Sequence, residues 1–152
     1  MSVSAFTSGY TSISNKLGTQ ADLKFSKKNV SVTALWDTGA TRTCISKEVV
    51  TELCLIPLGK KRMLTPSGPL IVNTYQIDIL LPNNVTVPDV VVCDSEIGAQ
   101  GIGVLVGMDI INLGDFAVSN YNGKTAFSFR IPSQKRTDYV AELKRRKVSG
   151  VN

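Results

Sequence analysis

The most constraining feature of this chain is the tetrapeptide Asp37-Thr38-Gly39-Ala40, which directly follows a largely apolar, β-favouring run at residues 30–36. A carboxylate therefore arrives where a buried strand is expected to end. Gly39 allows a tight turn and leaves no side chain to obstruct a bound chain, and Thr38 can hold the turn through its hydroxyl group. The pattern favours an aspartate poised for acid–base chemistry. The alternative is an ordinary turn residue that closes a strand.

A second motif lies downstream, where the apolar strand Val104-Leu105-Val106 is followed by Gly107 and by the start of a short helix at 108–111. The two motifs together resemble the retropepsin-like aspartic proteases, which include retroviral enzymes and cellular relatives. The resemblance covers roughly residues 21–132. In that family the aspartate of the first motif is catalytic, and the second strand passes beside its turn.

The resemblance implies an all-β fold: a single-lobe acid-protease β-barrel with a flap hairpin and one or two short helices. It assigns catalysis to Asp37, Thr38 and Gly39, and it places Ala40 and Val106 beside the substrate. Because each chain carries one catalytic turn, a second copy must supply the other aspartate, which implies a symmetric homodimer. The substrate would be a peptide or protein in extended conformation, and neither a metal nor an organic cofactor is required.

The family also implies a flap that closes over the substrate, and by position it corresponds to residues from about Met63 to Thr74. Its tip would contribute further substrate-binding residues, namely Thr65, Pro66, Ser67 and Gly68. Glycine at a tip allows close approach of backbone to a ligand. The alternative is an ordinary connecting turn. Two prolines at this tip differ from the more glycine-rich flaps of retroviral enzymes.

A second departure from the retroviral pattern concerns Met108, which stands where those enzymes carry an arginine that pairs with acids near the catalytic turn. The Gly-Met-Asp form resembles the cellular branch instead. Asp109 is expected to cap the short helix. The dimer contacts should therefore differ from the viral ones, and we expect them to involve the terminal segments and the helix near Ile110-Ile111.

The amino-acid composition excludes several classes of catalytic site and indicates the cellular compartment. The chain has no histidine, which excludes Ser-His-Asp and Cys-His nucleophile systems and zincin motifs. Its three cysteines show no Cys-x-x-Cys spacing, so buried free thiols in a reducing cytoplasm are expected. No apolar stretch approaches the length that crosses a bilayer, and the first residues do not resemble a secretory signal. These features predict a cytoplasmic protein without membrane association.

Three segments are expected: a Ser/Thr-rich arm at 1–20, the protease domain at 21–132 and a basic tail at 133–152. The arm is either loose or forms an edge strand at Tyr10–Ser14 that pairs only in a dimer. Within the domain most segments have strand patterns, and a short helix is expected to begin at Ser46. The spacing of turn residues is typical of a barrel or sandwich.

The tail holds +4 of the chain's net charge of +5. Thr137 is expected to cap a helix from Asp138 to about Lys147, with acidic residues first and basic residues last, as the helix dipole favours. The favoured interpretation is a solvated terminal helix. The alternative is an electrostatic arm for nucleic acid through residues 135–147, which no aromatic interleaving supports.

Two classes of function remain on sequence grounds. The first is an aspartic endopeptidase that activates a water molecule between two Asp37 carboxylates. The second is a non-catalytic dimerisation or peptide-binding module on the same fold. The intact Asp-Thr-Gly-Ala favours the protease, because a binding module has no need of that carboxylate.

Overall fold

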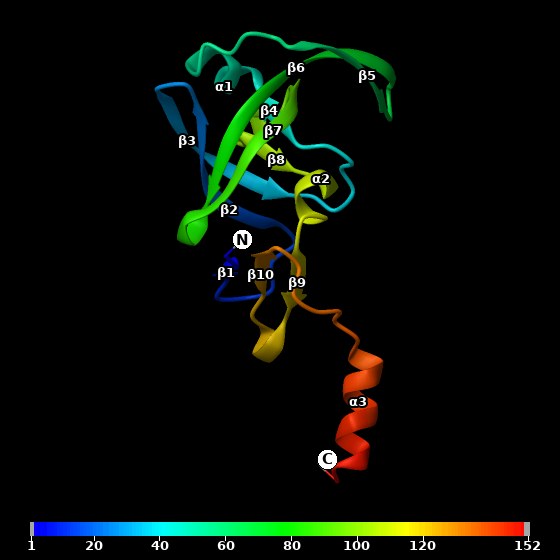
Figure 1. The fold of residues 1–152 in the computed structure, drawn as a ribbon. Coiled ribbons are helices and arrows are strands. Elements are labelled where there is room, and N and C mark those ends of the chain that lie inside the picture. Colours follow the sequence, from blue (N-terminus) through cyan, green and yellow to red (C-terminus); the bar gives the residue numbers. More distant parts are fainter. Residues whose placement is uncertain (1, 151–152) are drawn as a thin grey trace.

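The computed structural model describes residues 2–150. Its elements follow the order β1 (Ser4–Gly9), β2 (Leu17–Phe25), β3 (Lys28–Trp36), β4 (Cys44–Ser46), α1 (Lys47–Glu52), β5 (Gly59–Thr65), β6 (Gly68–Leu81), η1 (Pro82–Asn84), β7 (Val85–Ser95), η2 (Gly98–Gln100), β8 (Val104–Val106), α2 (Met108–Ile111), β9 (Asp115–Ser119), η3 (Tyr121–Gly123), β10 (Ala126–Ile131) and α3 (Tyr139–Val148). Figure 1 shows them as a β-rich body from which α3 projects.

Six strands close into a barrel in the order β2-β3-β8-β4-β7-β6, because β2 pairs with β6 as well as with β3. The strand β5 adds to the far side of β6 and extends beyond the barrel. The pairs β3–β8 and β4–β7 are parallel. The predicted all-β, single-lobe barrel with few short helices is confirmed.

The barrel core consists of alternating apolar side chains from these strands, which is the pattern that a strand buried on one face requires. The least exposed members include Leu23, Ile45, Ile79, Val92 and Val104. The helix α1 covers one end, and Ser46 caps it as expected, because its hydroxyl oxygen accepts a hydrogen bond from the N–H of Val49 at 3.2 Å.

A second sheet, in the order β1-β10-β9, packs against the barrel. The contact is an aromatic cluster in which Trp36, at the end of β3, meets four phenylalanines of the small sheet. Phe6 comes from β1, Phe116 from β9, and Phe127 and Phe129 from β10. This cluster joins the beginning and the end of the chain beside the strand that carries Asp37.

The first strand differs from the expectation. It spans Ser4–Gly9, upstream of the predicted edge strand at Tyr10–Ser14, and it pairs within the chain with β10. The expected domain boundary at residue 21 falls inside β2. The ordered fold therefore includes most of the segment expected to be an arm, because Phe6 supplies part of the aromatic core.

The helix α3 spans Tyr139–Val148, and its cap is Asp138 in place of the predicted Thr137. The carboxylate of Asp138 accepts a hydrogen bond from the N–H of Ala141 at 3.0 Å. None of the helix's side chains is buried. Within residues 2–150 no helix has the length and apolar character needed to cross a membrane.

Candidate active site

Asp37 lies at the end of β3, immediately after the buried Trp36. Its backbone N–H donates to the carbonyl oxygen of Val106 in β8 at 2.9 Å, which continues the parallel pairing of the two strands by one more bond. Hydrogen bonding to β8 therefore fixes the position of the main chain as far as Asp37. The side chain is half-buried, so the carboxylate leaves the sheet at the barrel's end while keeping access to solvent.

The turn after Asp37 is held by its own carboxylate. The N–H of Gly39 donates to Oδ1 of Asp37 at 2.8 Å, and the N–H of Ala40 donates to the Asp37 carbonyl at 3.2 Å. A Cβ atom at position 39 would lie 3.1 Å from Oδ1, which is closer than most side chains tolerate. Thr38 and Gly39 are exposed. One carboxylate oxygen is thus fixed by the turn, and two of the three predicted catalytic residues face solvent.

The loop of residues 37–43, which we name the Asp37 loop, rests on α2 and on the glycine before it. The N–H of Met108 donates to the Ala40 carbonyl at 2.8 Å. A Cβ atom at Gly107 would lie 2.7 Å from the carbonyl of Arg42 and 2.9 Å from that of Ala40. Only glycine therefore fits between the Asp37 loop and the helix at this separation.

A buried threonine that sequence reasoning missed completes this support. The hydroxyl of Thr43, which is fully buried, donates to Oδ1 of Asp109 at 2.7 Å and accepts from the N–H of Gly107 at 3.1 Å. The N–H of Thr43 donates to Oδ2 of Asp109 at 2.9 Å. In the sequence, the only sign of this contact was that a threonine follows the first motif and an aspartate follows the second.

The role expected for Asp109 needs correction. Gly107 occupies the N-cap position of α2 and makes no side-chain capping bond. Asp109 lies in the first turn, where Oδ1 also accepts from the N–H of Ile110 at 2.9 Å. Its carboxylate thus binds the end of the Asp37 loop and the helix start together, which explains why an acid follows the Gly-Met pair.

The hairpin predicted between residues 63 and 74 is present. Thr65 and Gly68 are register partners, so Pro66 and Ser67 form the turn. The hydroxyl of Thr65 donates to the Gly68 carbonyl at 2.7 Å, and Gly68 has φ of +113°, a value that side chains disfavour. Pro66 and Ser67 are exposed, and Thr65 and Gly68 are half-buried.

The base of the hairpin rests on a cluster of sulfur-containing and apolar side chains. Cys44 of β4 and Cys93 of β7 are register partners, and Val72 of β6 and Met63 of β5 pack against them. Burial, reinforced by the neighbouring Cys93, raises the pKa of Cys44 to about 11, and burial also raises the pKa of Cys93. Both thiols are therefore held protonated and unreactive at neutral pH.

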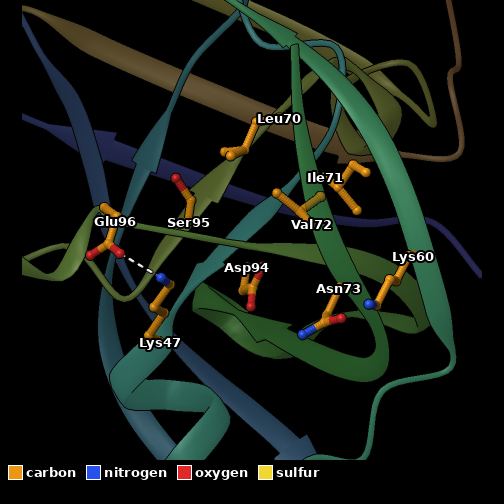
Figure 2. A pocket seen from close by; sticks show the side chains of 9 residues that line it. All are labelled: Lys47, Lys60, Leu70, Ile71, Val72, Asn73, Asp94, Ser95 and Glu96. Atoms are coloured by element: carbon orange, nitrogen blue, oxygen red, sulfur yellow. Dashed lines mark hydrogen bonds and ion pairs between the residues drawn. The ribbon is translucent and has the colours of Figure 1, made fainter.

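A hollow of about 670 Å³ lies between the hairpin strand β6 and the end of β7. Figure 2 shows the Lys47–Glu96 ion pair at one side of it, and Lys60 and Asn73 at the other. The hydrogen bond to Glu96 raises the pKa of Lys47. Leu70, Ile71 and Val72 give the hollow an apolar wall. Asp37 is not among its lining residues, so the hollow does not contain the candidate catalytic turn.

One expectation about an individual residue is wrong. The side chain of Val106 is wholly buried, so it cannot line a substrate cleft, and its carbonyl group instead positions Asp37. Ile110 and Ile111 are 1% and 5% exposed within the single chain. Their side chains belong to the core of the single chain, so dimer contacts of this helix would have to come from its other residues, and the expected dimer role of the helix stays a prediction. Apolar residues beside a motif have the same pattern whether they face a ligand or the core.

A closed six-stranded barrel with an Asp-Thr-Gly turn at the end of a buried strand defines a class, the single-lobed retropepsin-like aspartic protease fold. The sequence profile of the family described as gag-polyprotein putative aspartyl protease matches residues 11–112. The chain belongs to this family. No curated protein sequence matches the chain.

A solved structure from a bacterium supports the fold. The crystal structure of a retropepsin-like aspartic protease from Rickettsia conorii is similar with a TM-score of 0.53 and 14% sequence identity, over 86% of this chain and 96% of that one. The solution structure of simian foamy virus protease is similar with a TM-score of 0.47 and 19% identity, over 63% of this chain and 92% of that one.

Proposed function

We propose that this protein is an aspartic endopeptidase whose active site forms when two copies bring their Asp37 carboxylates together. The observation that carries the proposal is the placement of Asp37. Its backbone is bonded to Val106, its Oδ1 is held by the N–H of Gly39, and its side chain remains accessible. Because this carboxylate is already held in place, little further conformational entropy is lost when the reaction begins.

The chemistry follows from two carboxyl groups in contact. Two adjacent carboxylates do not both ionise readily, so the pair shares one proton. The ionised Asp37 takes a proton from a water molecule whose oxygen attacks the peptide carbonyl carbon. The protonated Asp37 donates its proton to the carbonyl oxygen. The tetrahedral intermediate then collapses, the C–N bond breaks, and the amine leaves after it receives a proton from the pair.

The neighbouring residues have supporting roles in this proposal. Thr38 hydrogen-bonds across the two turns, and Gly39 and Ala40 leave room for the substrate backbone. The β5–β6 hairpin is the flap, with Thr65, Pro66, Ser67 and Gly68 at its tip. An extended peptide would bind through main-chain groups there, as strands recognise one another. Support comes from the exposed two-residue turn and from the anchored base of the hairpin.

The test uses purified protein and the Asp37→Asn variant with a proteome-derived peptide library from mildly acidic to neutral pH, and new termini are mapped by mass spectrometry. Asp138→Asn is the matched control, because asparagine also caps a helix well and this residue lies in the tail. Cuts made by the wild type and the control but not by Asp37→Asn support the protease. Equal cutting by Asp37→Asn would exclude it. A dimeric wild type that binds peptides without cutting them would instead support the binding module.

A further inference from the structure

The face of the β5–β6 hairpin that is turned toward the barrel carries a lysine. Along β5 the side chains of Lys61, Met63 and Thr65 are half-buried, whereas the residues between them are exposed. Lys61 is the register partner of Val72 in β6, and partners in an antiparallel pair point to the same face of the sheet. Val72 is buried in the cluster at the base of the hairpin, so Lys61 lies on the same face as that cluster.

Arg42, in the Asp37 loop, supplies a second positive charge beside this cluster. Its carbonyl oxygen accepts a hydrogen bond from the thiol of Cys44 at 3.8 Å. Burial raises the pKa of the Cys93 thiol, and the positive charges of Lys61 and Arg42 partly oppose that rise, so both charges lie near this thiol. Figure 1 shows the hairpin and the Asp37 loop on the same side of the body. One cation thus comes from the hairpin and the other from the loop that follows Asp37.

Neither cation has an acidic partner within the chain. None of the ion pairs among residues 2–150 involves Arg42 or Lys61. The two acids whose charges also reach the same thiol are engaged elsewhere, because Asp94 accepts a hydrogen bond from the hydroxyl of Tyr75 at 3.4 Å and Asp109 holds the end of the Asp37 loop. Two like charges near one point repel each other, and a carboxylate bound from outside the chain would remove this repulsion.

We propose that Arg42 and Lys61 select peptide substrates that carry an acidic side chain at one fixed position relative to the bond that is cut. The carboxylate of that side chain binds both cations, and the guanidinium of Arg42 can hold its two oxygens at once. The methylene groups of the same side chain pack on Met63, the half-buried residue packed against the apolar cluster. This inference rests on the proposed function, because it places the substrate between the hairpin and the loop that carries Asp37.

The test compares Arg42→Glu and Lys61→Glu with Arg62→Glu. The last variant is the matched control, because it makes the same change of charge one position along β5, on the exposed face of the hairpin. Each protein is incubated at neutral pH with the peptide library of the cleavage assay. We expect an acidic residue to be enriched about tenfold at one position of the wild-type products. The enrichment should disappear in Arg42→Glu and Lys61→Glu and persist in Arg62→Glu.

Circular dichroism confirms that each variant is folded, and Arg42→Gln or Lys61→Gln replaces a charge reversal that does not fold. Wild-type cleavage without acidic enrichment would overturn the inference and leave the proposed function intact. Enrichment that survives the loss of both positive charges would do the same.

A binding measurement distinguishes failure of this inference from failure of the proposed function. Library peptides that bind to Asp37→Asn are captured and identified by mass spectrometry, with and without Arg42→Glu in the same chain. Acidic enrichment that is lost with Arg42→Glu supports the inference, even if the wild type cuts nothing and the proposed function is thereby contradicted. Bound peptides without acidic enrichment, or the absence of bound peptides, would overturn the inference.

Discussion

The carboxylate of Asp109 accepts two hydrogen bonds from Thr43, one from its N–H at 2.9 Å and one from its hydroxyl at 2.7 Å. This pair connects the end of the Asp37 loop to the start of α2, across 66 residues of sequence. The hydroxyl of Thr43 also accepts the N–H of Gly107. The buried polar contact between Thr43 and Asp109 thus anchors the loop that carries the candidate catalytic carboxylate.

Replacing Thr43 with valine should therefore destabilise the fold. Valine keeps the shape but leaves the buried N–H of Gly107 without an acceptor and removes a donor to Asp109, so we expect a loss of about 1–3 kcal/mol in the free energy of unfolding. Urea denaturation measures it. Thr43→Ser keeps the hydroxyl and should lose clearly less. Equal stability of Thr43→Val and wild type would show that the contact contributes nothing.

Gly107→Ala should displace the Asp37 loop. The added methyl group would lie 2.7 Å from backbone atoms of Arg42, and backbone cannot move aside as a flexible side chain can. We expect a loss of roughly 1–3 kcal/mol in unfolding free energy, together with reduced cleavage. Gly9→Ala is the control, because nothing lies within 4 Å of its added Cβ. If the two variants are equally stable, the close approach at Gly107 is not a constraint.

The three cysteines should differ sharply in reactivity toward a thiol reagent at neutral pH. Cys54 is exposed, whereas Cys44 and Cys93 are buried, and burial raises the pKa of Cys44 to about 11. We expect one fast-reacting thiol per native chain and three after denaturation. Cys54→Ser should remove the fast phase. A fast phase that persists in this variant would mean that the base of the hairpin opens readily.

The carboxylate of Asp115 should make the stability of the fold depend on pH. Its carboxylate accepts from the N–H of Gln134, the hydroxyl of Ser133 and the guanidinium of Arg130, and these bonds hold its pKa well below the ordinary value of 3.8. A lowered pKa in the folded state means that the stabilisation is present above pH 3.8 and is lost as the pH falls further.

Asp115→Asn should accordingly be less stable than the wild type at neutral pH, and the gap should narrow as the pH falls below 3.8. Thermal denaturation across this range measures the gap. A gap that does not change with pH would mean that the charge of Asp115 is not the source of its stabilisation.

The elements that were predicted best from the sequence are those determined by residues close together in the chain. The strand before Asp37, the cap at Ser46 and the hairpin turn at Pro66-Ser67 follow from residues within a few positions of each other, and all are present. The barrel followed from the resemblance of two motifs. Local chemistry therefore located the candidate turn and the class of fold.

The features that sequence missed depend on contacts between distant residues. The Thr43–Asp109 bonds and the pairing of β1 with β10 join segments far apart in the chain. None of these segments carries a local sequence pattern that identifies the segment it contacts. Val106 was misassigned for a related reason, since apolar side chains have the same sequence pattern whether they line a cleft or the core. The small sheet became visible only in three dimensions.

The central claim, one active site built from two chains, is tested most directly by mixing. Wild type and Asp37→Asn are combined in equal amounts under conditions that allow subunits to exchange, and cleavage is compared with wild type at the same total concentration. If both carboxylates are required, only wild-type pairs are active, and roughly a quarter of the activity should remain. Retention of roughly half would mean that each chain acts alone, and would contradict the account.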